Sequence, residues 1–137
     1  MLTVLAPLFD LVVGDRPNPN TIKSRDKLAM SHLAAGRTAE AIPLYKRTLA
    51  DCGRVLGADH PDTLRSRDNL AMAYRAAGQT AKAIPLLERT AADFERVLGA
   101  DHPDTLTSRN NLAMAYRAAG QEDLAASADE PKRHRPI

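Results

Sequence analysis

The chain has 137 residues, a formal net charge of +2 and few aromatic residues. This length suits one domain, and the charge is too small to indicate a nucleic-acid or membrane partner. The single cysteine, Cys52, excludes an internal disulfide and a cysteine-based zinc site, so we predict no cofactor and no metal from this composition.

The chain opens with an apolar segment, Met1 to Val13. It lacks the basic start and the small-residue cleavage site of a signal peptide, and it is shorter than the ~20 apolar residues that span a bilayer. Residues Phe9 to Gly14 instead align with Phe94 to Gly99. We therefore predict a half-repeat helix at 1–14, a linker at 15–20 and a cytoplasmic protein without a membrane partner.

From Thr21 onward the sequence repeats every 42 residues. The block at 21–62 returns at 63–104 with about 29 of 42 positions identical, and the third copy starts at Thr105 with about 15 of its first 17 residues unchanged. Such a period is typical of stacked repeats, in which each unit buries its apolar face on its neighbours. We predict full repeats at 21–62 and 63–104 and a partial repeat at 105–128.

Each copy is predicted to contain two antiparallel helices. In the second copy Asp59 is a candidate N-cap, and Gly78 ends the first helix. Residues at helical spacing form its apolar stripe: Leu64, Leu70, Ala71, Tyr74 and Ala77. Leu28, Leu70 and Leu112 are therefore expected to occupy equivalent interior positions in the three copies.

The second helix of this copy is predicted to begin after Thr80 as N-cap and to end at Gly99, with a slight bend or a delayed start at Pro85. Its buried face consists of Ala83, Ile84, Leu87, Ala91, Phe94, Val97 and Leu98. Cys52 occupies the position of Phe94 in the preceding copy, so we expect a small core residue there.

Beyond Gln121 the apolar pattern fades. Leu124 is the one large apolar residue before Pro131, which stops any helix, so only the stub of a second helix is expected. Residues 129–137 contain a basic run from Lys132 to Arg135 and are predicted to form a disordered tail. No aromatic platform accompanies this run, and we predict no nucleic-acid partner.

Catalytic motifs are missing from the sequence: it has no phosphate-binding glycine loop and no nucleophile with a partnered base. His60 and His102 could ligate a metal with the neighbouring aspartates, or they could simply mark helix starts. Equivalent positions in stacked helices lie ~10 Å apart, whereas metal–nitrogen bonds are ~2 Å. We therefore interpret both histidines as helix-start residues and predict that the protein is not an enzyme.

The order of a large residue, a small residue and an aromatic at Leu70, Ala71 and Tyr74 resembles the tetratricopeptide repeat family. The 42-residue period, the NNLAMAY string and the Asp-His-Pro-Asp linker are similar to the kinesin-light-chain type found in bacteria. The resemblance implies an all-α fold, an α-solenoid of antiparallel helix hairpins that forms a right-handed superhelix. One departure is arginine where the family has a bulky apolar residue; the stems would pack while the charged heads reach water, at Arg25, Arg67 and Arg109.

The resemblance also implies a concave groove, lined by the first helix of each copy, that holds a peptide or a partner helix. Carried over by position, the groove residues are Lys23, Asp26, Lys27, Met30 and Leu33, then Arg65, Asp68, Asn69, Met72 and Arg75, then Asn110, Asn111, Met114 and Arg117. Chaperone-binding relatives use a lysine where this chain has Asp26 and Asp68, which argues against a chaperone C-terminus as ligand.

Three functions remain open on the sequence. The first is a non-catalytic protein–protein interaction module that captures a peptide or partner helix in the groove. The second is a scaffold that self-assembles head-to-tail, or by helix exchange, through its uncapped half-repeats. The third is a regulatory module or fragment of a larger signalling protein.

Overall fold

The computed structural model describes residues 18–129, which form six helices and no strand. The helices are α2 (Pro19–Ala34), α3 (Thr38–Leu56), α4 (Pro61–Ala76), α5 (Thr80–Leu98), α6 (Pro103–Ala118) and α7 (Glu122–Asp129). The predicted half-repeat helix at 1–14 lies outside the described residues, as does most of the predicted basic tail.

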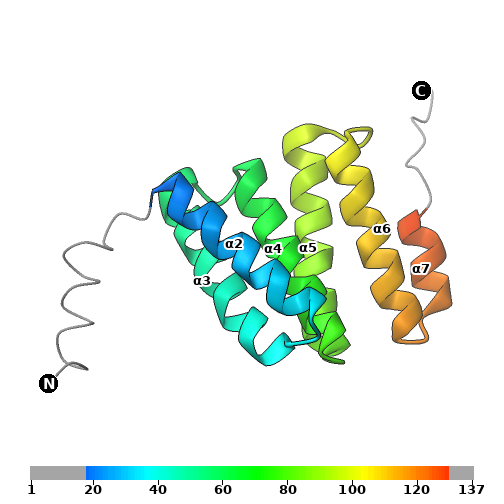
Figure 1. The fold of residues 1–137 in the computed structure, drawn as a ribbon. Helices are drawn as coiled ribbons and strands as arrows, with labels where there is room; N and C mark the ends of the chain where they lie inside the picture. Colours follow the sequence, from blue (N-terminus) through cyan, green and yellow to red (C-terminus); the bar gives the residue numbers. More distant parts are fainter. Residues whose placement is uncertain (1–17, 130–137) are drawn as a thin grey trace, which may run out of the picture.

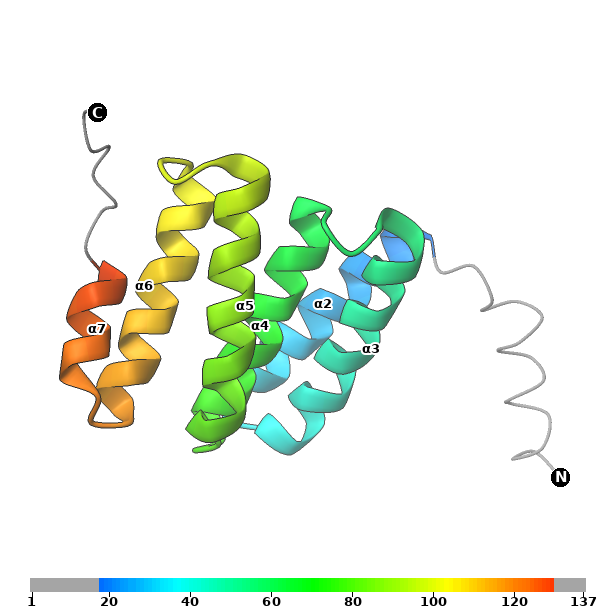
Figure 2. The ribbon, with the colours of Figure 1, turned by 180° about the vertical axis from the view of Figure 1, so that it is seen from behind.

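The six helices form three antiparallel hairpins that stack side by side in chain order, from blue to red in Figure 1. Each helix packs on the next one along the chain, and α4 also contacts α6. Figure 2 shows the opposite side, where α3 and α5 lie in front of α2 and α4. The predicted all-α helical-repeat solenoid is confirmed. No helix within 18–129 is long and apolar enough to cross a bilayer.

The first helix of a repeat begins at a proline, and the histidine before that proline is the N-cap. The His60 Nδ1 atom accepts a hydrogen bond from the backbone N–H of Asp62 at 3.0 Å, and His102 caps α6 in the same way. This confirms the helix-start interpretation of the histidines. The predicted cap at Asp59 is wrong, because the proline fixes the cap one residue later; the Asp59 carboxylate instead accepts from Arg96 at 2.7 Å.

The second helix of the middle repeat begins at Thr80 itself, so the prediction of Thr80 as its N-cap is also wrong. Gln79 is the cap residue, without a side-chain cap bond, and the helix continues through Pro85 with no delayed start. The glycines end the helices as predicted. Gly78 has φ of 78° and Gly99 has φ of 95°, conformations that residues with a Cβ rarely adopt.

The core runs as a continuous stripe between the helices. Its fully buried large side chains include Tyr45, Leu64, Leu87 and Phe94. Cys52 is buried where Phe94 lies in the next repeat, as predicted. Val97 was predicted to be buried but is exposed, in the last turn of α5.

The expected equivalence of the three leucines holds for two of them. Leu70 and Leu112 are buried, but Leu28 is 51% exposed. The physical reason is the neighbour on the N-terminal side: α3 packs on α4 and α5 packs on α6, whereas within the described residues no helix precedes α2.

Candidate functional site

The residues predicted to line the groove all lie on α2, α4 and α6, but they differ in accessibility. Exposed ones are Lys23, Lys27, Met30, Arg65, Asn110 and Arg117. Partly buried ones are Asp26, Leu33, Asn69, Met72, Arg75, Asn111 and Met114. Asp68 is the exception, because it is buried.

A hollow of about 190 Å³ lies between α4 and α6 and brings several of these residues together. Four predicted groove residues line it: Arg65, Asp68, Asn69 and Asn111. The sequence analysis missed the other three lining residues: Phe94, Asp104 and Thr107. The repeat itself could have indicated Thr107, which occupies the position of Arg65 one period later, whereas Phe94 belongs to a second helix and was assigned to the core.

Asp68 is the most unusual residue of the hollow. Its side chain accepts a hydrogen bond from the Ser108 hydroxyl at 3.4 Å, and Asn111 supplies another. Burial of the carboxyl raises the pKa of Asp68 to about 7, against these two bonds and the nearby charge of Arg67. A carboxyl with such a pKa is only partly ionised at neutral pH.

The first repeat contains a half-buried version of the same arrangement. The Asp26 carboxylate accepts a hydrogen bond from the Asn69 amide at 3.4 Å, which joins α2 to α4 as Asp68 and Asn111 join α4 to α6. Burial also raises the pKa of Asp26 above its ordinary value. Acid–amide pairs therefore recur along the first helices, with one repeat between them.

Arg65 forms one side of the hollow and links two repeats. Its guanidinium donates to the Asp104 carboxylate at 3.1 Å and also pairs with Asp62. Asp104 lies in the first turn of α6, where a carboxylate is favoured by the helix dipole. The charge of Arg65 is therefore balanced by two carboxylates.

The charged heads of the repeat arginines do not reach water as expected. Arg67 is buried and donates to Asp93 at 2.8 Å, and Arg25 makes the equivalent bond to Asp51 at 2.5 Å. Arg109 is buried too and donates to the backbone of α7. The reason is that a carboxylate or a carbonyl on the second helix of the same hairpin supplies the partner that buried guanidinium groups need.

Two further predicted groove residues, Arg75 and Arg117, are engaged away from open solvent. Arg117 pairs with Asp129 at 2.5 Å and lies 4.0 Å from Glu122, both on α7. The Nη1 atom of Arg75, one repeat earlier, is buried and has no hydrogen-bond partner among the described residues. The structure thus ties Arg117 to the second helix of its hairpin, and the hollow includes neither arginine.

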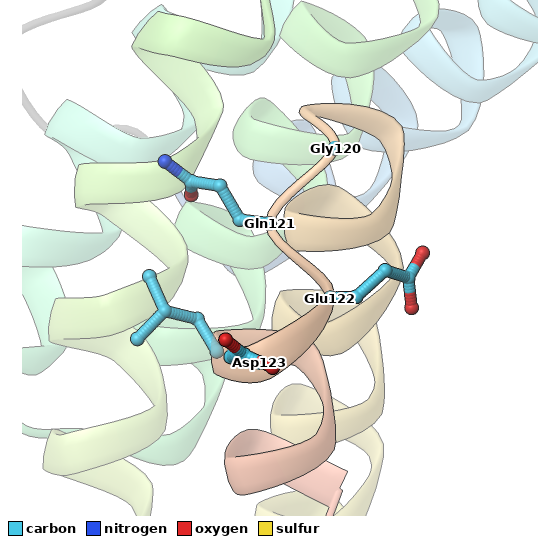
Figure 3. A pocket seen from close by; sticks show the side chains of 5 residues that line it. Gly120, Gln121, Glu122 and Asp123 are labelled. Atoms are coloured by element: carbon cyan, nitrogen blue, oxygen red, sulfur yellow. The ribbon is translucent and has the colours of Figure 1, made fainter.

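Another hollow, of about 360 Å³, lies at the turn between α6 and α7 and is lined by residues 120–124. All of these residues are exposed. Figure 3 shows the Gln121 and Glu122 side chains pointing to opposite sides of the turn. No group of three or more potential metal ligands occurs in the described part of the chain. The polar hollow between α4 and α6 is therefore the better candidate site.

Comparisons with known proteins agree with this architecture. A family model described as tetratricopeptide repeat matches residues 20–95 and 75–130. A crystal structure of a Podosopora anserina protein with kinesin light chain nearly identical TPR-like repeats is 35% identical, with a TM-score of 0.74, over 82% of this chain and 53% of that one. No protein with curated function matches.

A more distant similarity concerns the fold alone. The structure of BtubC (BKLC) from P. vanneervenii has a TM-score of 0.76 at 19% identity and covers 97% of this chain. Alignments cover 53% and 58% of the two solved chains, so this chain spans little more than half of their length.

Proposed function

Because the chain belongs to the tetratricopeptide repeat family, of the 42-residue kinesin-light-chain-like type, we propose that it is a non-catalytic interaction module that binds a peptide segment along α2, α4 and α6. Repeats of this family mediate protein–protein interactions. The observation that carries the proposal is the polar hollow between α4 and α6. It offers amide and guanidinium groups on a surface of otherwise well-packed helices.

The chemistry of the hollow suits an extended peptide. The amides of Asn69 and Asn111 can each donate and accept, as the backbone of a bound peptide requires. The Asn69 amide is already oriented by Asp26, and the guanidinium of Arg65 is held by Asp104. Groups held in place before binding lose less conformational entropy when the ligand arrives.

The test is selection of binders from a library of random short peptides, followed by fluorescence anisotropy with the selected sequences. We expect Asn69→Ala and Asn111→Ala to weaken binding by about tenfold each, equivalent to ~1.4 kcal/mol. The paired change Asn69→Ala with Arg75→Ala is expected to weaken it further. The matched control is Arg89→Ala on the exposed side of α5. Equal affinities for all variants, or no selected peptide, would contradict the proposal.

Head-to-tail self-assembly is a second candidate, favoured by the exposure of Leu28 and Met30 on α2. A second helix from another copy could cover this face, and such a heterologous contact can propagate. Light scattering at increasing concentration tests it. We expect the average mass to rise, and Leu28→Lys to return it to the monomer value. A chain that stays monomeric throughout the concentration range would eliminate this candidate for solution.

A further inference from the structure

The carboxyl of Asp68 lines the hollow and yet has no cationic partner among the described residues. Its side chain is 7% exposed and its hydrogen bonds come from neutral groups, the Ser108 hydroxyl and the Asn111 amide. A buried carboxylate without a cation is costly. Nearly all other buried charges in the structure are arranged differently: Arg67 and Asp51, for example, each have a charged partner.

The cations near Asp68 are committed elsewhere. Arg67, one residue away on α4, is bonded to Asp93 at 2.8 Å. Arg65 lines the same hollow but is shared between Asp62 and Asp104. The remaining lining residues on α4, α5 and α6 carry no positive charge. The charges around the opening therefore sum to a negative value when Asp68 is ionised.

The size of the hollow limits what can enter it. Its volume of about 190 Å³ is smaller than the ~300–1,000 Å³ of clefts that hold drug-sized ligands. It equals the share of roughly six water molecules at ~30 Å³ each. That volume suits a single long side chain, whose apolar stem could contact Phe94 while its charged end reaches Asp68.

We propose that this hollow is a specificity subsite that takes one basic side chain, lysine or arginine, of the bound peptide and pairs its charge with the Asp68 carboxylate. The inference rests on the proposed peptide-binding function and adds the chemistry of the partner. The subsite selects against an acidic residue at this register, because a second carboxylate beside Asp68 and Asp104 would be repelled.

The repeat sequence gives the subsite a fixed place along the groove. The residue equivalent to Asp68 is Asp26 in the first repeat and Asn110 in the third. Asp26 is only half-buried and Asn110 is exposed and uncharged. The basic residue is therefore read at the junction of α4 and α6, and the two flanking repeats contribute weaker preferences.

The first experiment uses the full chain and a small probe, Nα-acetyl-lysine N-methylamide, with the norleucine analogue as the uncharged control. Nuclear magnetic resonance follows the Asp68 carboxyl carbon and the side-chain amides of Asn69 and Asn111. We expect saturable shifts in the millimolar range with the lysine probe only. Bound cation also lowers the pKa of Asp68, by roughly one or more, because an opposite charge favours the ionised form.

Variants separate a specific subsite from general attraction. Asp68→Asn is compatible with the repeat, since the third copy has Asn110 at this position. We expect it to weaken the lysine probe at least about tenfold, while the matched change Asp26→Asn has less than about a threefold effect. Melting curves verify that both variants fold. The wild-type pKa measurement needs no variant, so a misfolded Asp68→Asn would not remove the test.

Two results would overturn the inference: equal shifts with the lysine and norleucine probes, or unchanged affinity in Asp68→Asn. The peptide selection separates this failure from failure of the proposed function. Selected peptides without a basic residue that depends on Asp68 would leave peptide binding standing and the subsite refuted. A lysine probe that binds at Asp68 while no peptide is ever selected would refute peptide binding and keep the subsite.

Discussion

Helices α2 and α4 have nearly the same sequence, yet their apolar stripes have different environments. Leu70 on α4 is 5% exposed and Leu28, one period earlier on α2, is 51% exposed. The difference comes from α3, which packs on α4, while α2 has no described helix on its N-terminal side. In a stack, the same residue is a core residue or a surface residue depending on whether the neighbouring unit covers it.

Contacts inside a hairpin do not show this difference. Arg25 bonds Asp51 between α2 and α3, and Arg67 bonds Asp93 between α4 and α5, with both arginine side chains largely buried. Both bonds join a first helix to its own second helix. The comparison therefore separates two kinds of stabilising contact: those that each repeat supplies for itself, and those that depend on the next repeat.

The largest expected effect concerns the leucines. Leu70→Ala should lower the free energy of unfolding by about 2–4 kcal/mol, because it leaves a cavity between α3 and α4. Leu28→Ala in a chain lacking residues 1–13 should cost less than about 1 kcal/mol, because that side chain is half exposed. Urea unfolding measures both values. Equal costs in the two backgrounds would mean that coverage by a neighbour does not distinguish α2 from α4.

The arginine pairs should behave alike in the two repeats. Arg25→Ala and Arg67→Ala are each expected to cost about 2–3 kcal/mol, because each leaves a largely buried carboxylate without its cation. Arg89→Ala is the control, since this exposed arginine lies 3.9 Å from Asp93 and should contribute less than about 0.5 kcal/mol. A cost for Arg67→Ala several times that for Arg25→Ala would show that these contacts also depend on the neighbouring repeat.

The buried carboxyl predicts an unusual dependence of stability on pH. The pKa of Asp68 is about 7 in the folded chain against 3.8 for a free aspartate, so between these values the folded state binds the extra proton. Stability linked to Asp68 is therefore present below about pH 4 and is lost as the pH rises through about 7. Asp68→Asn should be more stable than the wild type by roughly 1–3 kcal/mol near pH 8.

Thermal melts across the pH range test this prediction, and the gap between variant and wild type should close toward about pH 4. Asp26→Asn is the matched comparison and should show the same sign with a smaller size, because Asp26 is less buried. Asp51 and Asp93 act in the opposite direction. Arginine bonds lower the pKa of each, despite burial, so their stabilisation is lost only in acid below about pH 3.8. A constant gap at every pH would contradict the Asp68 assignment.

The smallest expected effect concerns residues 1–13. We predict that this segment packs as a second helix against α2, so its deletion should lower the free energy of unfolding by about 1–2 kcal/mol and the melting temperature with it. In the full chain, Leu28→Ala should then cost more than in the deleted chain. The difference, about 1 kcal/mol, is the coupling between the segment and Leu28. Identical melting curves with and without the segment would show that it does not belong to the stack.

Much of the fold was predictable because the repeat makes the same statement several times. The helix order, the glycine ends and the burial of Cys52 follow from apolar spacing and from alignment of the copies. The caps were less predictable: Asp59 has a common capping side chain, but the proline after His60 decides which residue lies at the cap position. Helix propensities alone do not contain that backbone geometry.

The candidate site was half predictable. Periodicity identified the helices and most of the residues, including Arg65, Asn69 and Asn111. It could not reveal that Asp68 is buried while Asp26 is only half-buried, or that Phe94 from another helix borders the same hollow. A residue's repeat position gives the face of its helix, whereas the accessibility of that face depends on atoms contributed by neighbours.

The sequence by itself determined the unit: two antiparallel helices, repeated every 42 residues, with one polar and one apolar face on each helix. Those features follow from hydrophobic periodicity and from glycine and proline, which act locally along the chain. Only the tertiary structure decided that Arg67 and Arg109 are buried with partners, that Leu28 remains exposed and that Asp68 lines a hollow without a cation. The physical reason is that burial and pKa are set by the full set of surrounding atoms, which side-by-side stacking brings together from distant parts of the chain.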